Sequence, residues 1–360
     1  MAWTGTAWQL VEPGKPLVRK TFRAPDPEAD EAVVAVAGCG VCHTDIGFIH
    51  GGVRTRQALP LTLGHEVAGC IVALGSAAGA AEIGIGQDVI IPAVLPCGAC
   101  DWCAAGRQNI CPDQKMPGND LDGGFASHVV VPSRFLVPVP RRPDGLDLAH
   151  LAVVADAVTT PLQALRRASV GAGDSVVVIG VGGIGIHAVQ IAAAWQASVL
   201  AVDISAARLD RARRFGAAGA VRTEGLDDRA AREAVRTAAA DAGWPARGAK
   251  IFEMSGTATG QRLAWSLLTP GATLAVVGYT RDKISCRLSN LMAFDAEAFG
   301  SWGCPPSLYP EALALIVERR IRVEPFVSFH PLDDVNTVIE KCHRSELSTR
   351  PVLTPGEESS

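Results

Sequence analysis

The stretch VVVIGVGGIG, residues 176–185, decides the fold of the central part of this chain. An apolar run of this length predicts a buried strand, and the glycines that follow it stand in a G-x-G-x-x-G frame. Such glycines permit a tight turn, and they let the backbone approach a pyrophosphate at the N-terminus of the next helix. The glycines of the frame are Gly180, Gly182 and Gly185, with Gly183 as a fourth.

The residues after this turn make the pattern specific. An apolar helix is predicted directly after Gly185, and Asp203 ends the next strand, SVLAVD. A carboxylate at this place hydrogen-bonds the ribose hydroxyls of an adenosine and repels a 2′-phosphate, which favours NAD over NADP. Arg208, five residues further on, weakens that exclusion. The alternative is that the glycines serve only helix–sheet packing.

The patterning changes along the chain. Up to about residue 155, short β-like runs alternate with Gly and Pro turns, as in EAVVAVAGCG and GQDVIIPAVLP, which is typical of a β-rich, partly closed domain. Strands then alternate with helices, which predicts βαβ units and a doubly wound parallel sheet. We therefore predict an α/β protein with a Rossmann domain at 157–300. The β-rich domain is expected to contain residues 1–156.

Composition excludes several classes of protein. The chain has 360 residues, a net charge of -4 and 48% hydrophobic residues, so two sizeable cores are possible. The acidic balance argues against nucleic-acid and membrane-surface binding, since both usually need a basic face. No run is long enough for a membrane span, and the N-terminus does not resemble a signal peptide. We expect a cytoplasmic protein.

Four of the ten cysteines lie within residues 97–111, at the spacing C-x2-C-x2-C-x7-C. A reducing cytosol disfavours disulfides, and four thiolates at this spacing favour a tetrahedral zinc. Because four thiolates leave no open position, such a site is structural. The alternative is a set of thiols without a metal. The four are Cys97, Cys100, Cys103 and Cys111.

A second candidate metal site comes from GCGVCHTD (38–45) and LGHEVAG (63–69). Cys42, His65 and Glu66 are plausible zinc ligands, and a catalytic zinc keeps three protein ligands with one open position. These segments, the four cysteines and the glycine turn occur in the order found in zinc-dependent medium-chain alcohol dehydrogenases, and the chain resembles that family over essentially its whole length. The resemblance implies a GroES-like catalytic domain of residues 1–156, completed by the C-terminal segment 301–360, and the Rossmann domain at 157–300 between them. It also implies NAD and two zinc ions per subunit.

The resemblance also implies roles for single residues at the catalytic zinc. Cys42 and His65 are implied ligands, with Glu66 as an alternate one. In VVADAVTTPLQAL, Asp156 occupies the place where many members have a cysteine ligand. A carboxylate is a good zinc ligand, and acidic residues serve there in polyol-type relatives. The other interpretation of Asp156 is a helix N-cap.

Further roles concern the proton and the cofactor. Thr44 matches the family residue that accepts the substrate hydroxyl proton, whereas Gly47 replaces the histidine that often continues the relay. Arg350 matches an arginine that contacts cofactor phosphate, and His43 is a candidate for the same pyrophosphate. Thr160 matches a residue near the nicotinamide.

A narrower resemblance lies outside these shared motifs. Residues 113–132, 153–161 and 267–304 resemble 6-hydroxycyclohex-1-ene-1-carbonyl-CoA dehydrogenases of the benzoyl-CoA degradation pathway. This implies NAD-dependent oxidation of a CoA thioester substrate to its 6-oxo product. The CoA anion site would use basic residues, and the candidates are Arg54, Arg56, Lys115, Arg281 and Lys283.

Three other functions remain as alternatives. The first is a general zinc alcohol or polyol dehydrogenase, which shares every metal and NAD motif. The second is a non-catalytic, zinc-stabilised NAD-binding scaffold, which would not need an open zinc site. The third is a zinc-free quinone or enoyl reductase, which the full set of metal-site residues disfavours. A homo-oligomer is implied by the family, with a tetramer favoured and a dimer as the alternative.

Overall fold

The structure is a computed structural model that describes residues 3–24, 26–78 and 83–356. Two compact units emerge from the pattern of contacts along the chain. The first contains the described residues up to Thr159, together with Gly303–Val317 and the chain from Arg322. The second contains Thr160–Trp302 and Glu318–Ile321. The assignment of domains 1–156 with 301–360 and 157–300 stays a prediction, and limited proteolysis would test it.

The first unit is rich in antiparallel strands. A three-stranded sheet has the order β2-β1-β4, and a seven-stranded sheet has the order β15-β16-β3-β5-β6-β8, with β7 also paired to β3. The strands are β1 (Trp3–Leu10), β2 (Val18–Ala24), β3 (Glu31–Gly40), β4 (Leu61–Thr62), β5 (Glu66–Leu74), β6 (Asp88–Ile91), β7 (His128–Pro132), β8 (Val137–Pro138), β15 (Val327–Pro331) and β16 (Arg350–Thr354).

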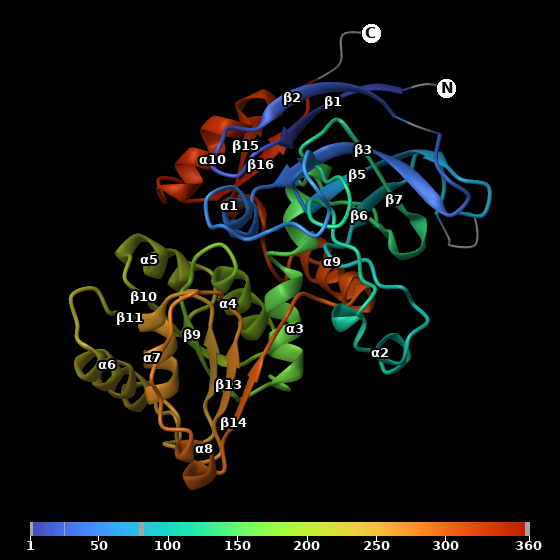
Figure 1. Ribbon diagram of the computed structural model, residues 1–360. Coiled ribbons are helices and arrows are strands. Elements are labelled where there is room, and N and C mark those ends of the chain that lie inside the picture. Colours follow the sequence, from blue (N-terminus) through green and yellow to red (C-terminus); the bar gives the residue numbers. More distant parts are fainter. Residues whose placement is uncertain (1–2, 25, 79–82, 357–360) are drawn as a thin grey trace. The chain divides into compact units, whose positions relative to one another are not determined.

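The C-terminal segment completes this unit. β16 pairs antiparallel with β3, with Val352 opposite Gly40, so the last strand lies beside one of the first. Figure 1 shows the red C-terminal strands and helix α10 against the blue N-terminal elements, and α10 contacts α1. Alternating buried residues of the strands, such as those of β7, fill the core. The helices and 3-10 turns of this unit are α1 (His43–Ile49), α2 (Asp101–Ala104), η2 (Gln108–Ile110), η3 (Ser133–Phe135), η4 (Leu148–Ala155), η5 (Pro306–Leu308), α9 (Tyr309–Val317), η6 (Glu324–Phe326), η7 (Leu332–Asp334) and α10 (Val335–His343).

The second unit is a parallel sheet of order β11-β10-β9-β12-β13-β14. Every residue of β9 is buried, as expected for a strand covered on both faces. The strand order reverses beside β9, and ligands of such folds bind at the carboxyl ends of the strands at this point. The strands are β9 (Ser175–Ile179), β10 (Ser198–Asp203), β11 (Gly219–Arg222), β12 (Lys250–Glu253), β13 (Thr273–Val276) and β14 (Glu297–Gly300).

Six helices accompany this sheet, and local capping explains where three of them begin. Ser205, Asp227 and Thr257 each accept a hydrogen bond from a backbone N–H in the first turn of α5, α6 and α7. The helices are α3 (Thr159–Arg167), α4 (Gly185–Ala194), α5 (Ala206–Arg214), α6 (Asp228–Asp241), α7 (Ala258–Ser266) and α8 (Ser289–Phe294). The predicted fold class, a β-rich domain with a doubly wound parallel sheet, is confirmed.

Within the described residues, no single helix combines the length and the apolar composition that crossing a membrane requires. Only Leu148–Ala155 and Thr159–Arg167, taken together as a bent pair, meet these two criteria. The residues of the first of these segments from Leu151 to Ala155 are buried in the protein.

Candidate metal and nucleotide sites

One cluster of metal-binding side chains lies in the first unit. Ligand atoms of Cys42, His65, Glu66 and Asp156 all lie within 4.8 Å of one another, although the residues come from three separate segments. Cys42 precedes α1, His65 directly precedes β5, Glu66 begins β5, and Asp156 follows η4. The strand β3 holds these segments together, because β5 pairs with it and η4 packs against it.

The spacing of three of these donors fits a zinc ion. Asp156 Oδ2 lies 3.6 Å from Cys42 Sγ and 3.7 Å from His65 Nε2. Zinc bonds of about 2.0–2.3 Å in a tetrahedron place neighbouring ligand atoms about 3.3–3.8 Å apart. The interpretation of Asp156 as a helix N-cap does not hold, because α3 begins only at Thr159 and the carboxylate lies beside the thiol and the imidazole.

The fourth member, Glu66, has a different partner. Its fully buried carboxylate receives two hydrogen bonds from the Arg350 guanidinium, one of them 3.0 Å long from Nε. Burial raises the pKa of Glu66 to about 7, against the opposing effect of Arg350. The predicted roles of Glu66 as an alternate metal ligand and of Arg350 as a phosphate contact stay predictions. The structure brings the two residues together as an ion pair beside the metal donors.

Sequence reasoning missed Asp45. This fully buried residue accepts hydrogen bonds from the backbone N–H of Cys42 (2.9 Å) and of Gly64 (3.2 Å), so it links the two segments that carry the first two donors. Its Oδ1 lies 3.6 Å from His65 Nδ1. Burial alone would lower the pKa of His65, but Asp45 and Asp156 raise it overall. The available signal was an acidic residue three positions after Cys42, where it forms a capping box.

Thr44 lies beside the donors. Its hydroxyl is 3.6 Å from Cys42 Sγ, and the residue is partly exposed, whereas His43 is exposed. His50, at the end of α1, pairs with Glu340 at 3.2 Å and stacks on His343. This partnership places His50 in the contact between α1 and α10.

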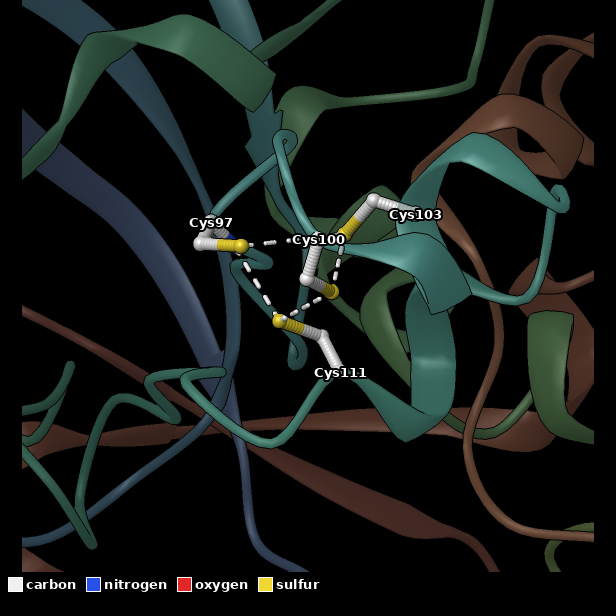
Figure 2. Close-up of side chains that lie close together, drawn as sticks. All are labelled: Cys97, Cys100, Cys103 and Cys111. Atoms are coloured by element: carbon white, nitrogen blue, oxygen red, sulfur yellow. Dashed lines mark hydrogen bonds between the residues drawn. The ribbon is translucent and has the colours of Figure 1, made fainter.

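The four cysteines of residues 97–111 form a second cluster, also with ligand atoms within 4.8 Å of one another. Figure 2 shows their sulfurs pointing toward a common centre, with Cys100 Sγ 3.5 Å from that of Cys103 and 3.7 Å from that of Cys111. All four are free thiols. Backbone N–H groups of Ala99 and Cys100 lower the pKa of Cys97 to about 7, which favours the thiolate that zinc binds.

Arg134 anchors this lobe to the sheet. Its guanidinium donates to the carbonyl of Cys97 at 3.0 Å and packs against Gly98, which has a φ of +74°. Only the short helix α2 and the turn η2 lie inside the lobe. A metal bound to the four sulfurs would therefore cross-link a lobe that has little secondary structure of its own.

The glycine turn lies between β9 and α4 in the second unit. Gly180 has a φ of +86°, and a side chain on it would overlap the backbone of Ser255. Gly182 opens onto free space, with only the Arg208 guanidinium within 4 Å of a built Cβ. Gly183 is exposed beside it, and Gly185 packs against Gly180. This turn has the backbone access that a pyrophosphate needs.

Asp203 ends β10 beside this turn. Its Oδ2 accepts from the N–H of Val181 and its Oδ1 from that of Ser205, both at 2.9 Å. Each carboxylate oxygen keeps a second lone pair for another donor. Arg208 Nη1 lies 3.9 Å from Oδ1, and the predicted effect of Arg208 on NADP exclusion stays a prediction. Thr160 is buried in the first turn of α3.

Glu253, at the end of β12, is a second buried acid that sequence reasoning missed. Its Oε1 accepts from the N–H and hydroxyl of Ser255, at 2.8 and 2.5 Å. Its Oε2 has no hydrogen-bond partner among the described residues and lies against Gly278. Burial raises the pKa of this carboxyl. The acid thus fixes the β12–α7 loop against which Gly180 packs.

Comparison with known proteins identifies the family. The alcohol dehydrogenase GroES-like domain matches residues 28–141, and the zinc-binding dehydrogenase domain matches residues 183–318. An alcohol dehydrogenase of Geobacillus stearothermophilus is 31% identical over 343 residues, covering 94% of this chain and 96% of the relative. The chain belongs to the zinc-dependent medium-chain alcohol dehydrogenase family. As a member it is an enzyme that acts on CH–OH groups, and the predicted family resemblance is confirmed.

Two more relatives extend the comparison. The D-arabinose 1-dehydrogenase (NADP(+)) of Saccharolobus solfataricus is 29% identical over 352 residues, which is 95% of each chain. The crystal structure of the alcohol dehydrogenase from Aeropyrum pernix superposes with a TM-score of 0.85, at 28% identity over 97% of this chain and 100% of that one. The narrower resemblance to CoA-thioester dehydrogenases is not among these findings and stays a proposal.

Proposed function

We propose that this enzyme oxidises a secondary alcohol to a ketone with NAD as hydride acceptor, at a zinc ion held by Cys42, His65 and Asp156. The observation that carries the proposal is the meeting of a thiol, an imidazole and a carboxylate at tetrahedral spacing. Three protein donors leave the fourth position of zinc for a substrate oxygen. A non-catalytic scaffold would have no use for that open position.

The residues of the chain have distinct roles in this reaction. When bound at these donors, zinc polarises the substrate hydroxyl and lowers its pKa. The Thr44 hydroxyl, 3.6 Å from Cys42 Sγ, accepts the substrate proton and passes its own proton to water, because the residue is partly exposed. NAD, when bound, would supply the nicotinamide that accepts the hydride from the substrate carbon. Asp45 keeps the Cys42 and His65 segments in place during turnover.

NAD is the proposed cofactor because the Asp203 carboxylate stands where the adenosine ribose of this fold binds. The relative named for NADP makes the choice worth measuring. We expect a higher kcat/KM with NAD than with NADP, and a reversed or lost preference in Asp203→Ser. Equal kcat/KM values for NAD and NADP in the wild type would show that Arg208 offsets the repulsion between the Asp203 carboxylate and the 2′-phosphate.

The proposed substrate is 6-hydroxycyclohex-1-ene-1-carbonyl-CoA, oxidised to the 6-oxo thioester. The support is the resemblance of residues 113–132, 153–161 and 267–304 to dehydrogenases of that substrate. Three candidate basic side chains of the first unit, Arg54, Arg56 and Lys115, are exposed and accessible to a CoA phosphate. Arg56 also pairs with Asp120 at 3.4 Å.

The test is NAD reduction with this CoA ester beside cyclohexanol, 2-cyclohexen-1-ol and sorbitol. A kcat/KM higher by orders of magnitude for the CoA ester supports the narrower proposal. Equal or better turnover of the free alcohols supports the second candidate, a general alcohol or polyol dehydrogenase. That candidate is favoured by relatives named for alcohols, D-arabinose and L-galactonate. No turnover of any alcohol by the zinc-loaded protein would refute both.

We also propose two zinc ions per chain, a homo-oligomer with a tetramer favoured, and a cytoplasmic location where the cysteines of the lobe stay reduced. Strand β14 supports assembly, because it pairs with β13 on one side and its other edge has no strand partner among the described residues. Exposed apolar residues at Tyr279, Leu288 and Met292 also support it. Light scattering after gel filtration would measure the oligomer. A monomer at micromolar concentration would refute the assembly.

A further inference from the structure

Tyr309 is a buried polar residue that no step above uses. It begins α9, is fully buried, and is one of the largest side chains in the core of the first unit. Its hydroxyl donates to the carbonyl of Ala155 at 2.5 Å and accepts from the N–H of Ala93 at 3.2 Å. One phenol thus ties together segments that are 154 and 216 residues away in sequence.

The first of these contacts lies next to the metal donors. Ala155 directly precedes Asp156, so the bonded carbonyl belongs to the peptide group that leads into the third donor. On the other side, the Thr159 hydroxyl donates to the Asp156 carbonyl at 3.5 Å. Asp156 itself has left the 3-10 helix, with φ -142° and ψ -58°. Its orientation therefore depends on how these two peptide groups are held, and also on the Arg350 guanidinium, whose Nη2 lies 3.9 Å from the Asp156 carboxylate.

The other two donors are held differently. Asp45 bonds the backbone N–H groups of Cys42 and Gly64, so one carboxylate fixes the segments of Cys42 and His65. Neither of these two bonds reaches Asp156. Residues that orient metal ligands usually tune metal affinity strongly, because misaligned donors cannot close the coordination shell.

We propose that Tyr309 is a positioning residue that holds Asp156 in register with Cys42 and His65 for metal binding. The inference rests on the proposed function, in which Asp156 is a zinc ligand. Loss of the Tyr309 hydroxyl would leave the buried Ala155 carbonyl and Ala93 N–H without their partner. The peptide group before Asp156 would then be free to rotate, and the carboxylate would leave the position set by its 3.6 Å distance to Cys42 Sγ.

The test is a double-mutant cycle on zinc affinity, with Tyr309→Phe and Asp156→Asn alone and together in the full-length protein. Zinc affinity is measured by chelator competition. Cys42→Ser removes a ligand of this site only, so it identifies which of the two zinc ions is bound here. The absorption spectrum after cobalt substitution reports the ligand geometry. The matched control is Tyr279→Phe, because Tyr279 is the only other tyrosine and is 74% exposed.

We expect Tyr309→Phe to weaken zinc binding by about 10–100-fold and to change the cobalt spectrum. Neither effect should appear in Tyr279→Phe, and Tyr309→Phe should add nothing in the Asp156→Asn background. An equal loss in that background would show a general structural role and overturn the inference. Unchanged affinity in Tyr309→Phe, with a loss in Asp156→Asn, overturns the inference alone. Unchanged affinity in Asp156→Asn overturns the proposed zinc site as well.

A second measurement covers the case in which Tyr309→Phe does not fold. With 3-fluorotyrosine at both tyrosines, fluorine NMR gives one signal for each, and Tyr279→Phe assigns them. Zinc should shift the Tyr309 signal in the wild type and leave it unmoved in Asp156→Asn. A Tyr309 signal that does not respond to zinc, or that responds equally in both proteins, overturns the inference.

Discussion

Gly185 and Gly182 lie in the same turn, but alanine should have different effects at the two positions. At Gly185 it should lower the stability of the fold, and at Gly182 it should weaken cofactor binding. In Gly185→Ala, the new methyl group would overlap the backbone oxygen of Gly180 and approach Val178. In Gly182→Ala, the methyl group would meet only the Arg208 guanidinium, at 3.8 Å. Gly182 is also absent from the glycines of positive φ, so alanine can adopt its backbone conformation.

The magnitudes follow from these contacts. Overpacking at Gly185 should lower stability by about 1–3 kcal/mol, which corresponds to a Tm lower by about 2–12 °C. Gly182→Ala should keep the Tm or raise it slightly, because alanine restricts the unfolded chain. Yet its methyl group would stand between the backbone and a pyrophosphate, and losing hydrogen bonds to a charged group weakens NADH binding by roughly 10–100-fold.

Thermal unfolding by circular dichroism and NADH fluorescence titration measure the two effects separately. The reasoning predicts a stable Gly182→Ala variant that binds NADH poorly. It also predicts an unstable Gly185→Ala variant. If Gly182→Ala bound NADH like the wild type, the turn would not be the pyrophosphate site. An unchanged Tm in Gly185→Ala would show that the packing against Gly180 is not limiting.

Three further predictions concern buried charges and the cysteine lobe. Arg350→Gln leaves the Glu66 carboxylate buried without its partner, and it should lower the free energy of unfolding by about 3–5 kcal/mol in urea titrations. The double variant with Glu66→Gln should recover much of that loss, and no recovery would contradict the pairing. Burial raises the pKa of Glu253 above 4.5, so its proton stabilises the folded state fully below pH 4.5 and this contribution is lost as pH rises through the raised pKa. The Tm of Glu253→Gln minus that of the wild type should therefore increase from pH 5 to pH 8. A difference that stays constant with pH would refute the raised pKa of Glu253. Cys103→Ser should lower the zinc content by one ion per chain, as measured by elemental analysis, and should make residues 97–111 sensitive to proteolysis. Unchanged protease resistance would show that the lobe folds without metal.

The sequence predicted best what is encoded locally. The strand, turn and helix of residues 176–185 lie within one continuous stretch, so glycine spacing and apolar periodicity were sufficient. The cysteine lobe is equally local, because all four sulfurs come from fifteen consecutive residues. Helix α10 was missed, because it has only three buried apolar positions, Val335, Val338 and Ile339, and the packing of this helix against α1 is visible only in the structure.

The residues that support the metal donors were missed for another reason. Asp45 resembles an ordinary helix cap in sequence, and its contact with Gly64 exists only after β3 and β5 pair. Tyr309 lies 153 positions after Asp156, and no periodicity connects them. Such contacts depend on tertiary packing, which a single sequence does not encode in any short pattern.

Charge balance at the proposed zinc site gives a reason for an aspartate in place of a thiolate there and for the pairing of Glu66 with Arg350. With zinc bound, the ion, the Cys42 thiolate, the Asp156 carboxylate and a neutral His65 would together have no net charge, the same as with two thiolates. The ion pair of Glu66 and Arg350 is neutral by itself, and both of its side chains are buried. If Glu66 moved to the metal, it would add a negative charge there and leave a buried guanidinium without its bidentate partner, which is strongly unfavourable. The electrostatics therefore support the proposal of three protein ligands, which would leave the fourth position of the metal for the substrate oxygen.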